Sequence, residues 1–224
     1  MKPTFKKKDI DLILIRHAPT AWNLEKRFQG HTDIPITEES KKWLTSWQKE
    51  KLLSYFSSPP KIFISPLQRA RFTAEALFNQ KVHIEHRLIE MNFGDWEGKT
   101  LLELKQEFGD EIQKNEDKGL DFTPAQGESP RHVLQRITPF FKEIYDQQIN
   151  VICISHLAVI RAVMAQATDW PMLGKPPYKL NHAEAHHFKI DAHGQPRIIT
   201  MNIKLTNLMN PHISPSHHNL LNQK

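Results

Sequence analysis

The chain has 224 residues, of which 25% are charged and 39% hydrophobic, with 30 Lys and Arg against 25 Asp and Glu, a net charge of +5 and a single cysteine. This composition excludes a collagen-like chain, a disulfide-stapled domain and an acidic disordered chain, and the length allows one α/β domain with an inserted cap. Four lysines and Asp9 place +3 of the net charge in residues 1–9, which predicts a short basic tail on a nearly balanced body. We therefore expect no nucleic-acid partner, with a polyanion-binding arm at Lys6–Lys8 as the alternative.

Targeting signals are weak in this sequence. The apolar run Leu12–Ile15 lies between Asp11 and Arg16 and is shorter than the ~7 to 15 residues of a secretory signal core. No run approaches the ~20 apolar residues of a membrane span. Because a lone cysteine also fits a reducing compartment, we expect a cytoplasmic protein without a membrane partner.

Short apolar runs rich in β-branched residues alternate with longer amphipathic stretches along the chain. This alternation predicts an α/β fold, a three-layer sandwich whose mainly parallel central sheet is flanked by helices. Strands are expected at residues 10–15, 61–64, 82–84, 151–154, 184–190 and 196–201. Helices are expected at residues 37–56, at 66–78 with Pro66 in the first turn, at 129–145 with a kink at Pro139, and at 157–167. We expect a single domain over residues 10–206, a cap-like excursion over one face of the sheet near 105–127, and a poorly ordered tail over 207–224.

Chemically capable side chains come after four of these strands. Each of the first four strands is followed within a few residues by one of them, in chain order His17, Arg69, Glu90 and His156. Ligands of an open parallel sheet bind beyond the carboxyl ends of its strands, so these side chains are expected in one site. Taken singly, each histidine could be a hydrogen-bonded structural residue and Arg69 an exposed helix cation.

Five motifs, taken in order, resemble those of the histidine phosphatase superfamily in its phosphoglycerate-mutase-like branch. The matching segments are Arg16-His17-x-x-Thr20, Gln29–Pro35, Ser65-Pro66-Leu67-x-Arg69-Ala70, the loop Glu90–Gly98, and Ser155-His156. One such motif is weak, but five in order across most of the chain are specific. The form of the Glu90 loop resembles phosphatase-type members, including those similar to α-ribazole phosphatase.

The resemblance implies a role for each matched residue. His17 matches the phosphorylated nucleophile and Glu90 the general acid, which protonates the leaving oxygen and then activates water. The expected phosphate pocket is formed by Arg16, Arg69 and His156, with further contacts from Asn23, Gln29, Gly30 and Leu157. The implied activity is transfer of a phosphoryl group from a small phosphorylated metabolite to water through a phosphohistidine on His17, with no cofactor.

Three questions stay open at this point. A cofactor-dependent phosphoglycerate mutase, or a catalytically silent member that binds a phosphorylated partner, would carry the same motifs. Family members usually have glycine after the nucleophile, whereas this chain has Ala18-Pro19, so the conformation of the phosphate loop is in question. A homodimer is allowed for, but no sequence feature decides it.

Two other signals are set aside. His182 and His186 have the i, i+4 spacing of zinc ligands on a helix, but the segment favours a strand, so no metal site is expected. Cys153 lacks an arginine six positions later, where Val159 stands, which argues against cysteine-phosphatase chemistry and favours a buried thiol.

Overall fold

The structure is a computed structural model, and it describes residues 7–211. Most of the expected basic tail (1–9) and of the expected C-terminal tail (207–224) lies outside these residues. Lys7, at the start of the described chain, forms an ion pair with Asp146 at 3.2 Å. None of the helices within residues 7–211 has the length and apolar character needed to cross a membrane.

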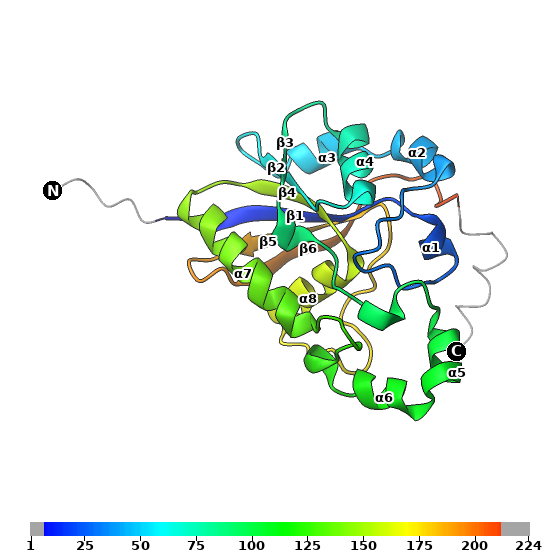
Figure 1. The fold of residues 1–224 in the computed structure, drawn as a ribbon. Helices are drawn as coiled ribbons and strands as arrows, with labels where there is room; N and C mark the ends of the chain where they lie inside the picture. The colour runs from blue at the N-terminus through cyan, green and yellow to red at the C-terminus, as the bar shows by residue number, and fades with distance from the viewer. Residues whose placement is uncertain (1–6, 212–224) are drawn as a thin grey trace.

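Six strands form one mixed sheet in the order β3-β2-β4-β1-β5-β6 (Figure 1). The strands are β1 (Ile10–Arg16), β2 (Lys61–Ile64), β3 (Val82–Ile84), β4 (Val151–Ser155), β5 (Glu184–Ile190) and β6 (Pro196–Lys204). The first four in this order are parallel, whereas β5 runs antiparallel to β1 and β6 antiparallel to β5. The expected α/β sandwich with a mainly parallel sheet is confirmed.

Helices cover both faces of the sheet. Since successive side chains of a strand point to opposite faces, a strand can contribute apolar residues to both cores. From β1, Ile13 and Ile15 pack into one core cluster and Leu12 and Leu14 into the other, each side chain contributing about 1.5 to 3 kcal/mol through burial. One face is covered by α2 (Glu38–Leu44), α3 (Lys49–Leu53) and α4 (Gln68–Leu77), the other by α7 (Pro130–Asp146) and α8 (Leu157–Thr168) (Figure 1). The last two lie where the sequence predicts them, and α7 continues through Pro139.

The helix predicted over residues 37–56 is wrong as a single element, since it is divided into α2 and α3. Between them, Thr45 and Ser46 donate hydroxyl hydrogen bonds to the carbonyl oxygens three residues earlier, at 2.8 and 2.7 Å. The Gln48 N–H donates to the Leu205 carbonyl at 2.6 Å and not to a carbonyl one turn earlier. These side-chain and long-range bonds compete with the helical pattern and interrupt it.

The start of α4 also differs from the prediction, because Pro66 precedes the first turn. The helix begins at Gln68 with Leu67 as its N-cap. Ser65 Oγ accepts from the Leu67 N–H at 3.3 Å, and the Asp33 carboxylate accepts from the Gln68 N–H at 2.9 Å. A side chain from a distant loop therefore caps this helix and holds that loop next to it.

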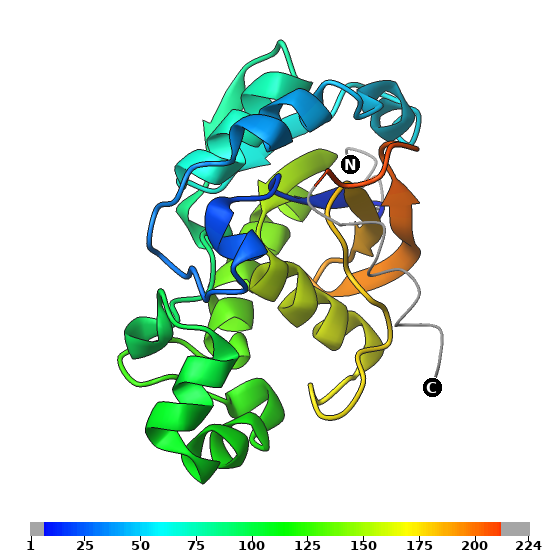
Figure 2. The same cartoon turned by 90° about the vertical axis from the view of Figure 1, so that its right-hand side faces the viewer.

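The insertion between the sheet elements, defined here as residues 101–127, holds α5 (Leu101–Phe108), α6 (Asp110–Glu116) and the 3₁₀ turn η3 (Gly119–Asp121). We predicted an excursion over one face of the sheet, but Figures 1 and 2 show α5 and α6 beyond the carboxyl ends of the strands, near α1 (Ala21–Leu24). Only Leu104 and Ile112 of these two helices are buried. Such helices have too little apolar surface to cover a sheet and instead form a wall beside it.

Candidate active site

The two histidine motifs meet because β1 and β4 are neighbours in register. Arg16 pairs with Ser155, so the next residues along the two strands, His17 and His156, leave the sheet side by side. The His17 N–H donates to the Ser155 carbonyl at 3.0 Å, and the two imidazole centroids are 5.2 Å apart. The sheet therefore brings together residues 139 positions apart in the sequence.

His17 is buried with one ring nitrogen engaged. Its Nδ1 lies 2.7 Å from the Ala18 carbonyl oxygen, which can only accept, so Nδ1 carries the proton and Nε2 carries the lone pair. Burial, and then the nearby Arg69, Arg16 and His182, hold the pKa of His17 well below its usual value of 6.5. The side chain is a neutral imidazole at pH 7, the form that can act as a nucleophile.

The loop after His17 accommodates alanine and proline without strain. Ala18 is not among the described residues with positive φ, so the position does not demand glycine. Its N–H donates to Thr73 Oγ1 at 2.9 Å, and the Pro19 carbonyl accepts from the Thr37 N–H at 3.1 Å. The departure from the usual family sequence therefore changes no backbone requirement here.

Arg69 is completely buried, and it holds two parts of the site together. Its Nη2 donates to the Gly30 carbonyl at 2.7 Å and its Nη1 to the Thr32 carbonyl at 2.9 Å, while its Nε donates to His156 Nδ1 at 3.3 Å. Burial lowers the pKa of Arg69, opposed first by the charge of Glu90. Because a guanidinium has five N–H donors, two remain for a ligand.

His156 lies behind Arg69 and does not line the cavity of the site. Since its Nδ1 accepts from Arg69, its Nε2 carries the proton and donates to Ser65 Oγ at 2.7 Å. Burial, followed by the charge of Arg69, holds the pKa of His156 well below 6.5. Both ring nitrogens are engaged, one by Arg69 and the other by Ser65, so neither is left for a ligand.

Arg16 presents an unsatisfied positive charge to the site. Its Nε is buried and has no hydrogen-bond partner. Burial lowers the pKa of Arg16 to about 10, with the charge of Glu90 raising it and that of Arg69 lowering it. The group stays protonated at neutral pH, and a buried cation with an unpaired donor suits an anionic ligand.

Glu90 is buried between the start of α8 and its own loop. One carboxylate oxygen accepts from the Met91 N–H at 2.9 Å and the other from the Ala158 N–H at 3.4 Å. Its main-chain carbonyl accepts from Arg136 Nη2 at 3.2 Å and from His31 Nε2 at 2.9 Å. Burial raises the pKa of Glu90 above its usual 4.5, which favours the protonated form.

The Glu97 carboxylate organises the loop around residue 30, whose carbonyl groups accept from Arg69 on its other side. From the sequence, Glu97 could equally have been a solvated loop charge or a local hydrogen-bond acceptor. One of its oxygens accepts from the His31 N–H at 2.8 Å, and the other accepts from both the N–H (2.8 Å) and the hydroxyl (2.5 Å) of Thr32. The residue comes directly after the 3₁₀ turn η2 (Gly94–Trp96), so the loops around residues 30 and 95 form one unit.

Gly30 packs directly against the Glu97 carboxylate. We therefore expect Gly30→Ala to displace Glu97 and to disrupt the site. A Cβ at this position, with φ +52°, would lie 1.8 Å from Glu97 Oε1. We expect a lower melting temperature and at least a tenfold loss in kcat/KM. Gly109→Ala is the matched control, because Gly109 has φ +54° and no atom within 4 Å of the added Cβ. Gly109→Ala carries the backbone strain of a positive φ without a clash, so it should cost about 1 to 3 kcal/mol and leave kcat/KM unchanged; equal losses of kcat/KM in both variants would contradict the role of the loop.

A cavity of about 580 Å³ opens at this edge of the sheet. It is lined by the predicted residues Arg16, His17, Asn23, Gln29, Arg69, Glu90 and Leu157, whereas Gly30 and His156 stand behind its wall. Asn23 Oδ1 accepts from the Thr20 N–H at 3.0 Å, which leaves its Nδ2 for the cavity, and Gln29 Oε1 is buried without a partner. These predicted residues supply one neutral imidazole, two guanidinium groups, one carboxyl group and polar amides. Further charged side chains also line the cavity, namely Lys26, Arg27, Arg161, Glu116 and Asp117.

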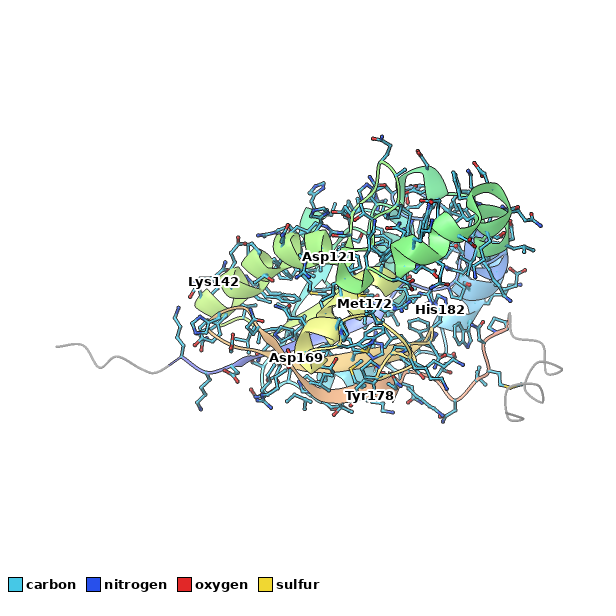
Figure 3. The ribbon with its side chains drawn as sticks, turned by 90° about the horizontal axis from the view of Figure 1, so that it is seen from below. Asp121, Lys142, Asp169, Met172, Tyr178 and His182 are labelled. Carbon is cyan, nitrogen blue, oxygen red and sulfur yellow. The ribbon has the colours of Figure 1, made fainter. Side chains whose placement is uncertain are left out.

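The far wall comes from the insertion and from the segment that links α8 to β5. Gln113 and Phe122 of the insertion line the cavity, as does Met172 of the linking segment. The Leu120 N–H donates to the Pro171 carbonyl at 3.1 Å and ties the two walls together. Figure 3 labels Met172 and, further along the same segment, His182. The walls are positioned by tertiary contacts that have no sequence motif.

The histidines considered as zinc ligands lie apart from any such cluster. His182 donates from Nδ1 to the His17 carbonyl at 3.0 Å, and His186, which lies in β5, accepts at Nδ1 from the Asn202 N–H at 3.3 Å. Across residues 7–211 there is no group of three or more His, Cys, Asp or Glu side chains arranged to hold a metal ion. His182 instead belongs to the surroundings of His17, which the sequence analysis did not predict.

Comparisons with known proteins agree with this geometry. Residues 12–204 match the family described as the histidine phosphatase superfamily (branch 1). The chain is 29% identical over 186 residues to adenosylcobalamin/α-ribazole phosphatase of Escherichia coli, covering 80% of this chain and 85% of that protein. It is 30% identical over 163 residues to the 2,3-bisphosphoglycerate-dependent phosphoglycerate mutase of Bartonella tribocorum, covering 68% and 79% of the two chains.

Two further comparisons bear on extent and fold. The chain is 30% identical over 172 residues to 6-phosphofructo-2-kinase/fructose-2,6-bisphosphatase of Arabidopsis thaliana, which is 75% of this chain but only 23% of that much longer enzyme. Phosphoserine phosphatase of Entamoeba histolytica, solved with 3-phosphoglyceric acid, superposes with a TM-score of 0.71 at 27% identity and covers 92% of this chain and 100% of its own.

Proposed function

This chain belongs to branch 1 of the histidine phosphatase superfamily, and from that membership we propose that it is a phosphomonoesterase that transfers a phosphoryl group from a small phosphorylated metabolite to water through His17. The observation that carries the proposal is the tautomer of His17, whose Nδ1 donates to the Ala18 carbonyl at 2.7 Å. Its Nε2 lone pair is left as the nucleophile, at the wall of a cavity that is also lined by Arg16, Arg69 and the buried Glu90.

In the first step, His17 Nε2 forms a bond to phosphorus while the ester P–O bond breaks. The attacking group is neutral because burial lowers its pKa, so no proton has to leave it first. Its Nδ1–H bond to the Ala18 carbonyl then stabilises the charge that the ring acquires. Division of the displacement into two steps lowers the barrier of each.

The charge that develops on the phosphoryl oxygens is met by Arg16 and by the two free N–H groups of Arg69. Leu157, at the first position of α8, adds the N-terminal end of a helix dipole that points at the cavity. His156 supports this pocket indirectly, because it orients Arg69. The dianionic phosphate is thus bound by cations that the fold already holds in position, so they need no rearrangement as charge develops.

Glu90 is the proposed proton donor and acceptor. With its pKa raised by burial, its protonated carboxyl group gives the proton to the leaving oxygen as the ester bond breaks. In the second step the resulting carboxylate accepts a proton from water, whose oxygen attacks phosphorus while the P–N bond to His17 breaks. Inorganic phosphate leaves, and both side chains return to their starting protonation states.

Phosphoglycerate mutase activity is the second candidate, since the mutase of Bartonella tribocorum is as similar to this chain as its phosphatase relatives. A mutase returns the phosphoryl group to a second hydroxyl of the substrate and needs a bisphosphoglycerate primer. We expect release of inorganic phosphate from phosphomonoesters without any primer. Interconversion of 2- and 3-phosphoglycerate that depends on the primer, with negligible phosphate release, would instead establish the mutase.

We further propose that residues 10–206 form the complete catalytic unit and that the chain acts in the cytoplasm. The site described draws on residues from β1 to the α8–β5 segment, all within this range. Cys153, the single cysteine of the sequence, is buried and free, as expected for a protein kept in a reducing compartment. A fluorescent fusion of the full chain tests the location, and we expect diffuse cytoplasmic fluorescence.

A further inference from the structure

Arg136, on α7, binds the main chain of the segment that carries Glu90 and does not itself line the cavity. Its Nη2 donates to the Ile89 carbonyl at 2.7 Å and to the Glu90 carbonyl at 3.2 Å, and its Nη1 donates to the Arg87 carbonyl. One guanidinium thus holds three carbonyl groups within four consecutive residues. The chemistry proposed above gives this side chain no role.

The segment before Glu90 depends on side-chain donors because it has left the sheet. β3 lies at the edge of the sheet and ends at Ile84, and the chain reaches Glu90 without entering another strand. Ser155 Oγ donates to the Leu88 carbonyl at 2.7 Å, so all four carbonyl groups of residues 87–90 accept from side chains. Since main-chain carbonyl groups shielded from water need donors, these side chains fix the backbone that aims Glu90.

Glu128 holds the chain on the other side of Glu90. Its Oε1 accepts from Arg136 Nε at 3.0 Å and its Oε2 from Arg136 Nη2 at 3.3 Å. The same Oε2 accepts from the Asn92 N–H at 2.9 Å, and the Glu128 N–H donates to the Asn92 carbonyl at 2.8 Å. We call this pair the Arg136–Glu128 clamp, because it binds the main chain before, at and two residues after Glu90.

The clamp is anchored in the core and is geometrically rigid. The two side chains are 19% and 23% exposed and neutralise each other. Arg136 follows the buried Val133 and precedes the buried Ile137 and Phe140, through which α7 packs onto the sheet. A guanidinium is a planar fork of donors, so one that is bonded on several edges cannot rotate without breaking several hydrogen bonds.

We propose that the Arg136–Glu128 clamp positions Glu90 for proton transfer to the leaving oxygen. A general acid works only within hydrogen-bond reach of that oxygen, and a displacement of about 1 Å can cost about 100-fold in rate. The inference rests on the proposed phosphatase function and assigns two positioning residues to it. The clamp acts through the main chain of Glu90, so it should matter only for substrates whose leaving group needs the proton.

Arg136→Met tests the clamp on two substrates. Glycerol 3-phosphate releases an alkoxide, which needs a proton, and p-nitrophenyl phosphate releases a phenolate, which does not. We expect kcat/KM to fall about 10- to 100-fold for the first and less than about threefold for the second. The inhibition constant of inorganic phosphate should stay within about twofold of the wild-type value, because Arg16 and Arg69 are unchanged. Partial loss of the fold would instead weaken phosphate binding and both activities together.

A double substitution ties the effect to Glu90. The proton is already lost in Glu90→Gln, so the addition of Arg136→Met should lower kcat/KM for glycerol 3-phosphate by less than about a further threefold. Glu128→Gln is a milder variant, in which an amide NH₂ that cannot accept replaces one oxygen of the clamp. It should show the same leaving-group dependence with a loss of about 3- to 10-fold for glycerol 3-phosphate, and it tests the clamp even if Arg136→Met fails to fold.

Arg131→Met is the matched control. Arg131 also lies on α7 and also donates twice to one carboxylate, that of Asp121, at 2.6 and 2.9 Å. Its partner belongs to the insertion and not to the Glu90 segment. The control removes the same charge and a comparable ion pair, so it should keep the wild-type ratio of kcat/KM between the two substrates.

Three outcomes would overturn the inference while the phosphatase function stands. They are equal losses on the two substrates in the clamp variants, a further loss of 10-fold or more when Arg136→Met is added to Glu90→Gln, or the same leaving-group dependence in Arg131→Met. A wild-type protein that hydrolyses neither substrate would reject the phosphatase function itself, and the role of the clamp with it.

Discussion

His17→Ala is expected to lose at least about 10⁴-fold in kcat for hydrolysis of p-nitrophenyl phosphate, the largest effect of any single substitution in this chain. The variant removes the atom that would bond to phosphorus, while Arg16 and Arg69 still hold the phosphate. Substrate binding should therefore survive better than turnover. Rapid acid-free quenching with ³²P-labelled substrate should trap a label on the wild-type protein that is stable to base and labile to acid, and none on the variant.

The control for this experiment is His193→Ala, because His193 is exposed in the turn between β5 and β6, away from the cavity. Circular dichroism and thermal melting should show that both variants fold. Turnover by His17→Ala at the wild-type rate would reject the phosphohistidine route. Binding of phosphate by a wild-type protein that neither turns over nor takes up label would identify a catalytically silent member.

Glu90→Gln is expected to have the second largest effect, and one that depends on the leaving group. For an alkyl phosphate, whose alkoxide needs a proton, kcat/KM should fall about 10² to 10⁴-fold. For p-nitrophenyl phosphate, whose phenolate leaves without help, the loss should stay below about tenfold. We choose kcat/KM because it reports the first step alone, and Glu107→Gln on exposed α5 as the matched control. Equal losses on both substrates would argue against Glu90 as the acid.

The pH dependence of the first step is set by two opposite pKa shifts. His17 must be neutral, and burial lowers its pKa well below 6.5, so activity is lost only as the pH falls through that lowered value. Glu90 must be protonated, and burial raises its pKa above 4.5, so activity on alkyl phosphates falls as the pH rises through the raised value. Glu90→Gln should remove the alkaline limb and leave the acidic limb.

The same substitution has a consequence for stability. A carboxyl group whose folded-state pKa is raised stabilises the fold fully only below its unfolded value, and this stability is lost as the pH rises through the folded-state pKa. Glu90→Gln cannot ionise, so its free energy of unfolding should improve relative to the wild type as the pH rises. Urea titrations at a series of pH values would measure this difference, and a constant difference would contradict the raised pKa.

The helix boundaries show where sequence periodicity is a good guide. α7 and α8 were predicted closely because each buries a continuous apolar face and begins at a recognisable position, Ser129 for α7. The single helix predicted over residues 37–56 had the right period but is interrupted, because the Gln48 N–H finds its acceptor in Leu205, far along the chain. The periodicity of neighbouring residues carries no information about a hydrogen-bond acceptor so far along the chain.

The reactive end of the cavity was predictable for a topological reason. Parallel strands end at one edge, so residues directly after β1 and β4 must lie together, and register then sets His17 beside His156. The sequence also placed Arg69 and Glu90 at the same edge. It did not indicate that His156 stands behind Arg69, that Glu97 organises the loop of Gly30, or that Arg161 faces the cavity.

The amino-acid sequence by itself determined the alternation of strands and helices, the edge of the sheet at which chemistry takes place and the residues gathered there, because these depend on periodicity and on the residue types directly after each strand. Only the tertiary structure decided which of these groups face a ligand and which hold another side chain in place. Arg69 bonds to a carbonyl 39 residues away and to an imidazole 87 residues away. Partnerships over such separations are set by the packing of the whole sheet and its helices, and so are the tautomers and charges of the residues that they join.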